Sequence, residues 1–437
     1  MSFPRHGQYK PSGLKLLGDV PMHWERTALK YMGEYQNGYP FKPEDRASQG
    51  LPIIRISQLS GDTGPNLYDG TLDDRVFVQE GDLLFSWSAT IDSFIWTGGP
   101  GWLNQHIFKV TPSGEAHKGF LFYVIKHIAP KLAEFDAHGS TMRHIKKESL
   151  GERIFVPSVD EQAKVSAFLD RETAKIDSLV EEQKRLIELL KEKRQAVISQ
   201  VVTKGLKPNV PMKDSGAQWL GKVPAHWVVL PLKHVVNFKS GGTPDKTRRE
   251  YWDGNVPWAS AKDLKVDFLH DTADHVTETA LAEGAATLVK AGTVLVVVRG
   301  MILARTFPVV TAMVSMAINQ DLKAATSRAP SRDDWLAWLL RASSVETLSR
   351  LDEAGHGTKA LRMDAWGEMR IAVPPSEEQE RIASFLLAEC ERIDSLVSES
   401  DLAIALLAER RSSLISAAVT GKIDVRGLVP QPEAIAA

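Results

Sequence analysis

The residues that could perform catalysis in this chain lack the spacing that enzymes use. A methyltransferase acting on an amino group needs an Asn/Asp-Pro-Pro-aromatic motif, but the only Pro-Pro pair, Pro374-Pro375, is followed by Ser376. The sequence has no G-x-x-x-x-G-K-[ST] phosphate loop, no H-E-x-x-H zinc motif and no G-x-G-x-x-G after a predicted strand. Pro244-Asp245 followed by Glu250 could begin a nuclease motif, but no lysine sits correctly after it. We therefore predict no catalytic residue.

Metal and cofactor ligands are also not predicted. Several histidines fall in the first third of the chain without regular ligand spacing, and we interpret them as core or surface residues: His106, His117, His127, His138 and His144. Cys390 is the only cysteine, which excludes an internal disulfide and a Cys-rich zinc site. We expect a cytoplasmic protein, since no signal peptide is recognisable and no apolar run approaches the roughly 18 residues of a membrane span.

Basic residues beside glycine point to binding rather than catalysis. The formal net charge is -2, so affinity for a polyanion must come from a local patch. Two loops at matching places carry cations, and a third group follows a Gly-rich turn, where the backbone could approach a phosphate closely. The predicted DNA contacts in these loops are Arg143, Lys146, Lys147, Lys359, Arg362, Ser240, Gly242, Thr243, Lys246 and Arg248. Ordinary solvated loops are the alternative.

Side chains at the ends of predicted strands could read bases, because Arg, Lys, Gln and Ser present hydrogen-bonding groups at groove edges. The candidates are Arg55, Ser57, Gln58, Trp87, Lys262 and Arg299. A tryptophan at a strand end is more often a core residue. Asn104-Gln105 recurs as Asn319-Gln320, and we favour a structural turn role for both pairs.

Two long helices must position these loops. Residues 158–203 and 376–420 contain no Gly or Pro, and their apolar residues recur at steps of three and four, which is typical of a coiled-coil seam. The predicted seam consists of Val165, Leu169, Ile176, Leu179, Leu186, Leu190, Val197, Ile382, Leu386, Ile393, Leu396, Leu407 and Leu414. A single helix cannot bury its own seam, so we predict that the two helices pack together.

The two helices belong to a tandem duplication. At an offset of 217, Ile176-Asp177-Ser178-Leu179-Val180 is identical to residues 393–397, and Glu161-Gln162 is repeated as Glu378-Gln379. Residues 13–30 recur at 216–233 with Val-Pro, His-Trp and Leu-Lys pairs retained. A repeat of this length outranks local propensity in predicting the fold.

The expected fold is α+β or α/β-like: two tandem globular domains with twisted mixed sheets and two long helices, in a pseudo-twofold repeat. We predict the boundaries 1–157, 158–203 (first helix), 204–215 (linker), 216–375, 376–420 (second helix) and 421–437 (tail). Strands are expected at 51–58, 82–88, 106–111, 153–156, 294–298 and 308–318, and shorter helices at 118–135 and 332–350. A twofold axis would make the long helices antiparallel and bring the chain start near the end of the second helix. A parallel pair stays open.

The whole chain resembles the specificity subunit of a type I restriction–modification system. The matching features are the W-L-G-x-V-P-x-H-W motif at residues 219–227 (LLGDVPMHW in the first copy), the SGGTP turn at 240–244, the repeated Asn-Gln pair and the V-P-x-x-x-E-Q junction into a long helix. The first copy departs from the turn pattern, with NGYPFKPED at 37–45.

This resemblance implies two target-recognition domains that each read half of a split double-stranded DNA sequence, spaced by an antiparallel coiled coil. It further implies two modification subunits that hold S-adenosylmethionine, a restriction/translocase subunit that uses ATP and Mg, and no cofactor or catalytic activity in this chain. A self-sufficient nuclease or methyltransferase, and a coiled-coil adaptor that does not bind DNA, are the alternatives.

Overall fold

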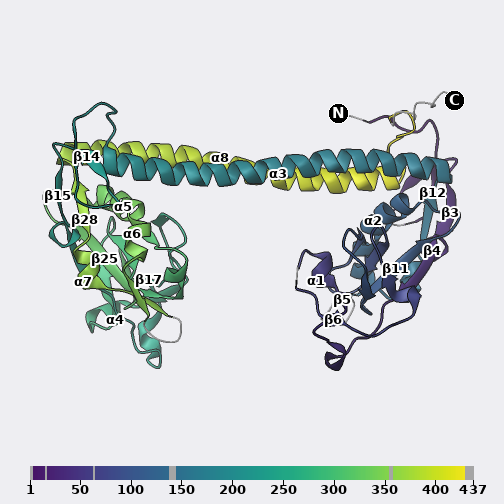
Figure 1. The fold of residues 1–437 in the computed structure, drawn as a ribbon, viewed down its shortest axis with the longest axis horizontal. Helices are drawn as coiled ribbons and strands as arrows, with labels where there is room; N and C mark the ends of the chain where they lie inside the picture. Colours follow the sequence, from purple (N-terminus) through teal and green to yellow (C-terminus); the bar gives the residue numbers. More distant parts are fainter. Residues whose placement is uncertain (1–2, 15–16, 63, 137–143, 354–357, 429–437) are drawn as a thin grey trace. The chain divides into compact units, whose positions relative to one another are not determined.

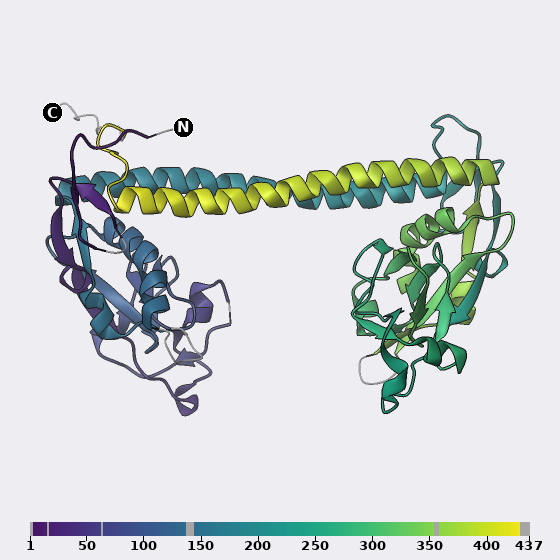
Figure 2. The ribbon, with the colours of Figure 1, turned by 180° about the vertical axis from the view of Figure 1, so that it is seen from behind.

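The computed structural model describes residues 3–14, 17–62, 64–136, 144–353 and 358–428. The chain forms two compact units, Met1–Gln183 with Asp401–Ala437 (unit 1) and Lys184–Ser400 (unit 2). Each unit combines one globular domain with parts of both long helices (Figures 1 and 2). The α+β class predicted from the sequence is therefore confirmed.

The unit 1 domain contains two four-stranded sheets. One sheet is antiparallel and has the order β4 (Gly33–Asn37), β11 (Ile107–Pro112), β8 (Leu83–Ser86), β9 (Asp92–Ile95). The other is mixed, in the order β6 (Leu67–Tyr68), β5 (Leu51–Ile54), β10 (Gly101–Leu103), β7 (Phe77–Val78). Helix α2 (Lys118–Asp136) packs on the first sheet, and β12 (Arg153–Val156) pairs with β3 (Glu25–Ala28) before the chain enters the first long helix.

The unit 2 domain repeats this topology. Strands β16 (Val236–Ser240), β25 (Leu322–Ser327) and β21 (Val294–Val297) take the places of β4, β11 and β8, followed by β23 (Val309–Ala312) and β18 (Phe268–Leu269). A second sheet has the order β19 (Asp274–Val276), β17 (Trp252–Ala259), β24 (Met316–Ile318), β20 (Thr287–Val289). Strand β15 (Val228–Pro231) pairs with β28 (Arg370–Val373), as β3 does with β12.

Three predicted elements differ from the structure. The strand expected at 51–58 ends at Ile54 and is followed by the short helix α1 (Ile56–Leu59), because the Gln58 side chain accepts a hydrogen bond from the Arg55 amide (3.1 Å) and caps that turn. The strand expected at 308–318 is divided into β23 and β24. The helix expected at 332–350 is two helices, α5 (Asp333–Ala342) and α6 (Ser344–Leu348), which meet at Ser343.

The two long helices are α3 (Val159–Lys204) and α8 (Ser376–Val419), and they pack side by side in antiparallel directions (Figures 1 and 2). In unit 1, Arg411 Nε lies 3.2 Å from Asp177 Oδ1. In unit 2, the repeat counterparts of these residues pair in the same way, with Arg194 Nε 3.1 Å from Asp394 Oδ1. In each unit the start of one long helix therefore packs against the end of the other, and the ion pair of one unit is repeated in the other.

The burial of the predicted seam is uneven. Ten of its side chains are buried or partly buried: Val165, Leu169, Ile176, Leu190, Val197, Ile382, Leu386, Ile393, Leu407 and Leu414. Leu179, Leu186 and Leu396 are instead 43%, 42% and 36% exposed, so their assignment to a buried seam was wrong. Near its ends each helix also packs on a domain core, which buries Phe168 and Ile198 as well. Farther along, only one helix surface is available as a partner, and part of the apolar stripe stays in solvent.

The chain start lies beside the end of α8, as predicted. Strand β1 (Tyr9–Pro11) pairs with β2 (Asp19–Pro21), the Tyr9 hydroxyl donates to the Gly421 carbonyl (3.1 Å), and the Asp424 amide donates to the Pro4 carbonyl (2.8 Å). In unit 2, β13 (Met212–Asp214) pairs with β14 (Lys222–Pro224), so the segment predicted as a linker contributes a strand. Within the described residues, we find no helix with the length and apolar character needed to cross a membrane.

Candidate nucleic-acid interface

The two repeated sequence motifs meet where each domain joins a long helix. In unit 1, Trp24 Nε1 donates to Glu161 Oε1 (3.1 Å) and His23 Nε2 lies 2.8 Å from Glu161 Oε2. In unit 2, Trp227 and His226 contact Glu378 at the same 3.1 and 2.8 Å. The His-Trp and Glu residues are therefore structural, and they fix the angle at which a helix leaves its domain.

The glutamine of each Glu-Gln pair ties the helix to a loop of the domain. Gln162 is 1% exposed; its Oε1 accepts from the His117 amide (2.9 Å), and its Nε2 donates to the Glu115 and Pro157 carbonyls (3.1 and 3.0 Å). Gln379 is fully buried, accepts from the Arg332 amide (3.0 Å) and donates to the Pro374 carbonyl (2.8 Å).

The packing of the turn itself explains why glycine is needed in the Gly-rich turn. A Cβ on Gly241 would lie 2.1 Å from the Asn319 carbonyl oxygen, and one on Gly38 would lie 2.3 Å from the Asn104 carbonyl oxygen. Asn319 Oδ1 accepts from the Asp321 amide (3.1 Å), and Asn104 Oδ1 from the His106 amide (3.4 Å). The turn of the first copy, although atypical in sequence, makes the same close approach, and the Asn residues hold it as the predicted structural turn.

Most of the predicted side chains around the Gly-rich turn of the second copy already bond to other groups of the protein. Ser240 Oγ accepts from Lys323 Nζ (2.5 Å), and Thr243 is hydrogen-bonded to Gln320. Arg248 contacts Glu250 (2.6 Å) and Glu283 (3.0 Å). These contacts leave Lys246 as the predicted cation of this turn that is exposed and makes no ion pair within the described residues. Gly242 is half-buried.

Two predicted residues of unit 2 are brought onto adjacent strands. A three-stranded sheet has the order β22 (Arg299–Gly300), β27 (Lys359–Leu361), β26 (Leu351–Glu353), and Lys359 lies opposite Gly300 in its register. Arg299 is exposed and unpaired among the described residues. Lys359 is neutralised by Glu353 (2.7 Å), whose pKa is lowered by this hydrogen bond. Arg362 lies 3.5 Å from Asp352.

Unit 1 places its predicted residues at the corresponding point of the fold. Ser88, after β8, bridges to His144, and the Ile145 amide donates to the Trp87 carbonyl (2.9 Å). Lys146 and Lys147 follow on an exposed turn without an ion pair in the described part of the chain. Trp87 is half-buried, and its Nε1 donates to Asn37 Oδ1 (3.2 Å). Arg143 lies outside the described residues.

The remaining candidates lie on other elements. Ser57 and Gln58 belong to α1, so their placement at a strand end was wrong, although Ser57 is exposed. Arg55 precedes α1. Its pKa is lowered mainly by burial and to a smaller extent by the charge of Arg46. Lys262 follows β17 and pairs with Asp274 (2.7 Å).

Further exposed cations lie near these candidates in unit 2. Arg249 follows Arg248 in the basic run after the Gly-rich turn, so the sequence already indicated it, and it is exposed. Arg305 follows the short helix Met301–Ala304, whose first residue is 73% exposed. No sequence signal marks Arg305, because its position depends on the connection between β22 and β23.

The match to known proteins follows the duplication. The model of the type I restriction modification DNA specificity domain matches twice, over residues 21–189 and 224–394. This chain belongs to that family. The two matches cover more than half of the chain, one in each copy of the repeat.

Curated relatives agree with this assignment. The specificity subunit of the Escherichia coli enzyme EcoR124I/EcoR124II is 27% identical over 36% of this chain and 39% of its own length. That of EcoBI, also from Escherichia coli, is 25% identical over 49% and 47%. The matched region thus spans less than half of either relative. The MjaVIII subunit of Methanocaldococcus jannaschii is 22% identical over 94% of this chain and 95% of its own.

Solved structures share the fold. A chain from a study of complex assembly and conformational transition of the type I R-M system superposes with a TM-score of 0.70 at 16% identity, covering 92% of this chain and 98% of that one. The HsdS subunit from Thermoanaerobacter tengcongensis gives a TM-score of 0.52, also at 16% identity, with the same coverage.

Proposed function

We propose that this chain is a non-catalytic DNA specificity subunit of a type I restriction–modification complex and that it recognises a bipartite, asymmetric sequence in double-stranded DNA, one half through each globular domain. It directs adenine methylation or ATP-dependent cleavage that partner subunits perform. The observation that carries the proposal is the repeated placement of exposed cations: the segment after β8 or β21 joins the loop before the last strand in both domains. Arg299 lies there in unit 2, and Lys146 and Lys147 in unit 1.

The cations differ in the role that their surroundings permit. A cation that is already paired with a carboxylate adds little net binding free energy for a phosphate, because it must give up the first ion pair to form the second. We therefore assign the main contacts to Arg299, Lys146, Lys147 and Lys246, which make no ion pair among the described residues. Arg143 is retained as a proposed contact. The predicted residues with acidic partners, Lys262, Lys359, Arg362 and Arg248, are assigned supporting roles.

The partners follow from the duplicated helices. Leu179 and Leu406 of unit 1 are 43% and 56% exposed, and their repeat counterparts in unit 2, Leu396 and Leu189, are 36% and 52% exposed. Exposed leucines at repeat-equivalent positions suit two copies of one partner. We assign these two surfaces to two modification subunits that carry S-adenosylmethionine, and expect a restriction/translocase subunit with ATP and Mg to join them in the cytoplasm.

The DNA-reading test uses the chain reconstituted with its modification subunit and a library of duplexes. Arg299→Ala is expected to relax specificity in one half-site only, by about 1–3 kcal/mol if the guanidinium reads a base. Lys146→Ala with Lys147→Ala should weaken binding to all sequences and reduce the salt dependence by about 0.9 for each phosphate that the protein no longer neutralises. Lys222→Ala, an exposed change on β14, is the control.

Some results would refute the proposal. An unchanged half-site preference in the Arg299 variant, together with unchanged affinity and salt dependence in the Lys146/Lys147 variant, would remove these surfaces from DNA binding. Cleavage or methylation of DNA by the purified chain alone would favour a self-sufficient enzyme.

For the partners, Leu179→Asp with Leu406→Asp should lower the number of bound modification subunits from two to one, whereas Val345→Asp, at a position 79% exposed, should not.

A further inference from the structure

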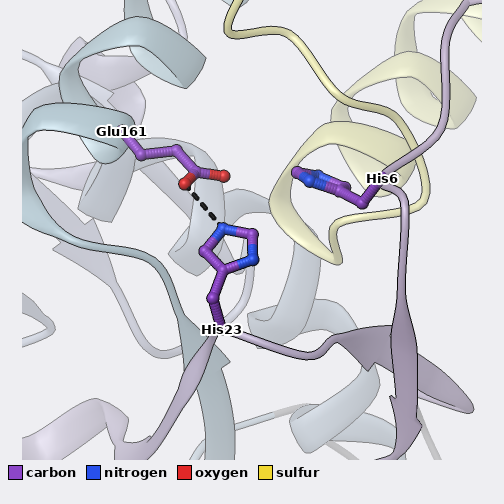
Figure 3. A group of neighbouring side chains, drawn as sticks. All are labelled: His6, His23 and Glu161. Atoms are coloured by element: carbon purple, nitrogen blue, oxygen red, sulfur yellow. Dashed lines mark hydrogen bonds and ion pairs between the residues drawn. The ribbon is translucent and has the colours of Figure 1, made fainter.

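One cluster of potential metal ligands lies in unit 1, apart from the proposed DNA surface (Figure 3). His6 comes from the N-terminal segment, His23 follows β2, and Glu161 lies in the first turn of α3. One ligating atom from each residue lies within 4.8 Å of the other two. Figure 3 shows the His6 ring beside the His23–Glu161 pair, with the chain's C-terminal segment passing behind it.

Unit 2 supplies an internal comparison. The His23–Glu161 contact of 2.8 Å has a counterpart of the same length between His226 and Glu378, so two members of the cluster belong to the repeated junction. The third member has no such counterpart. Strands β1 and β13 set the offset between the two segments, and at that offset His6 corresponds to Asn209, which is exposed. The extra histidine therefore needs an explanation other than the junction itself.

His6 is held in the interior without a hydrogen bond to its ring. Its side chain is 3% exposed, and its Nδ1 atom has no hydrogen-bond partner in the described structure. Asp424 Oδ2 lies 3.7 Å from this nitrogen, beyond hydrogen-bonding distance, and Asp424 is itself fixed by Arg426 Nη2 (2.6 Å). His6 therefore has a buried ring nitrogen that no hydrogen bond satisfies among the described residues.

The other two side chains are also suitably oriented. Glu161 is 7% exposed, and the indole of Trp24 holds its Oε1, so Oε2 is left on the side of the histidines. The His23 side chain is 43% exposed, which gives an ion access from solvent. Two imidazole nitrogens and one carboxylate oxygen form a known zinc-binding set with a fourth position left for water. Magnesium and calcium prefer oxygen ligands.

We propose that His6, His23 and Glu161 bind a divalent transition-metal ion of the zinc class, which fastens the N-terminal segment to the start of α3. Tetrahedral bonds of about 2.0–2.1 Å place ligand atoms about 3.3 Å apart. The His23–Glu161 separation then opens by about 0.5 Å, and the widest separation closes by up to about 1.5 Å, which small side-chain rotations achieve. No metal ligands were expected from the sequence, and this site would change that interpretation.

Zinc binding to the full-length chain tests the proposal. After removal of metal with a chelator, calorimetric titration with Zn²⁺ and elemental analysis should give one ion per chain. His6→Asn and His23→Asn should each weaken binding by about 100-fold or more, since even outer partners of a metal site contribute 10–100-fold. His226→Asn removes the corresponding histidine of unit 2 and should bind zinc as the unaltered chain does. Cobalt should give the visible absorption of a tetrahedral site in the same two proteins only.

Two results would overturn the proposal: no stoichiometric binding by the unaltered chain, or equal binding by the His6 and His226 variants. Circular dichroism of each variant identifies any loss of folding. If His6→Asn does not fold, His23→Asn decides the question, because its side chain is partly exposed and its replacement leaves the Trp24–Glu161 hydrogen bond in place. Zinc should also raise the melting temperature of the unaltered chain and leave that of the folded His23 variant unchanged.

Discussion

Replacement of Gln162 by alanine tests the structural role assigned to the Glu-Gln motif. The change removes three hydrogen bonds, of 2.9, 3.1 and 3.0 Å, from a side chain that is 1% exposed. At about 0.5–1.5 kcal/mol for each bond, the expected loss in the free energy of unfolding is about 3 kcal/mol. For a unit of roughly two hundred residues, this lowers the melting temperature by about 6–12 °C.

Calorimetry would measure this loss of stability, and hydrogen exchange of the backbone amides of residues 113–121 would locate it. The His117 amide, which donates to Gln162, should lose protection in the variant. Gln379→Ala removes two hydrogen bonds and should destabilise unit 2 by about 2 kcal/mol, a smaller effect. Lys164→Ala, an exposed change on the same helix, should stay within about 0.5 kcal/mol. A loss below about 1 kcal/mol for Gln162→Ala would refute the reasoning.

Three further predictions concern other parts of the chain. Burial, and next the charges of Lys131 and Lys422, lowers the pKa of His127 to about 4. As the pH falls from about 6.5 to 4, the unfolded chain takes up this proton before the folded chain does, so unit 1 should lose about 1–3 kcal/mol of stability. In urea unfolding, His127→Gln should remove this loss and His270→Gln should not. Arg341 is 8% exposed and donates to the Asp267 carbonyl (2.9 Å), so Arg341→Ala should destabilise unit 2 by about 3–5 kcal/mol in calorimetry, and a loss under about 1 kcal/mol would contradict its structural role. Insertion of one heptad into both α3 and α8 should change the spacer length tolerated in a duplex-library selection while both half-sites stay the same; an unchanged spacer would mean that the helices do not set it.

The ion pairs between the helices give part of the identical repeat a role within the chain. Asp177 and Asp394 pair with Arg411 and Arg194 of the opposite helix, and their side chains remain 58% and 57% exposed. The exposed leucines 179, 189, 396 and 406 are further candidates for docking a partner. Helical periodicity indicates an apolar stripe, but the neighbours that cover it decide which part is buried.

The sequence by itself determined the duplication, the two long helices and the family, because identities between two segments and helical periodicity are properties of the chain alone. It left the direction of the helix pair open. It did not determine which cations are available. Arg248 and Arg299 look equivalent in sequence, yet only Arg248 has carboxylates packed against it among the residues that the structure describes. Nor did it reveal the His6 cluster, whose members lie 17 and 155 residues apart along the chain. Such contacts arise only when sheets and helices bring distant segments together, so the tertiary structure decided them.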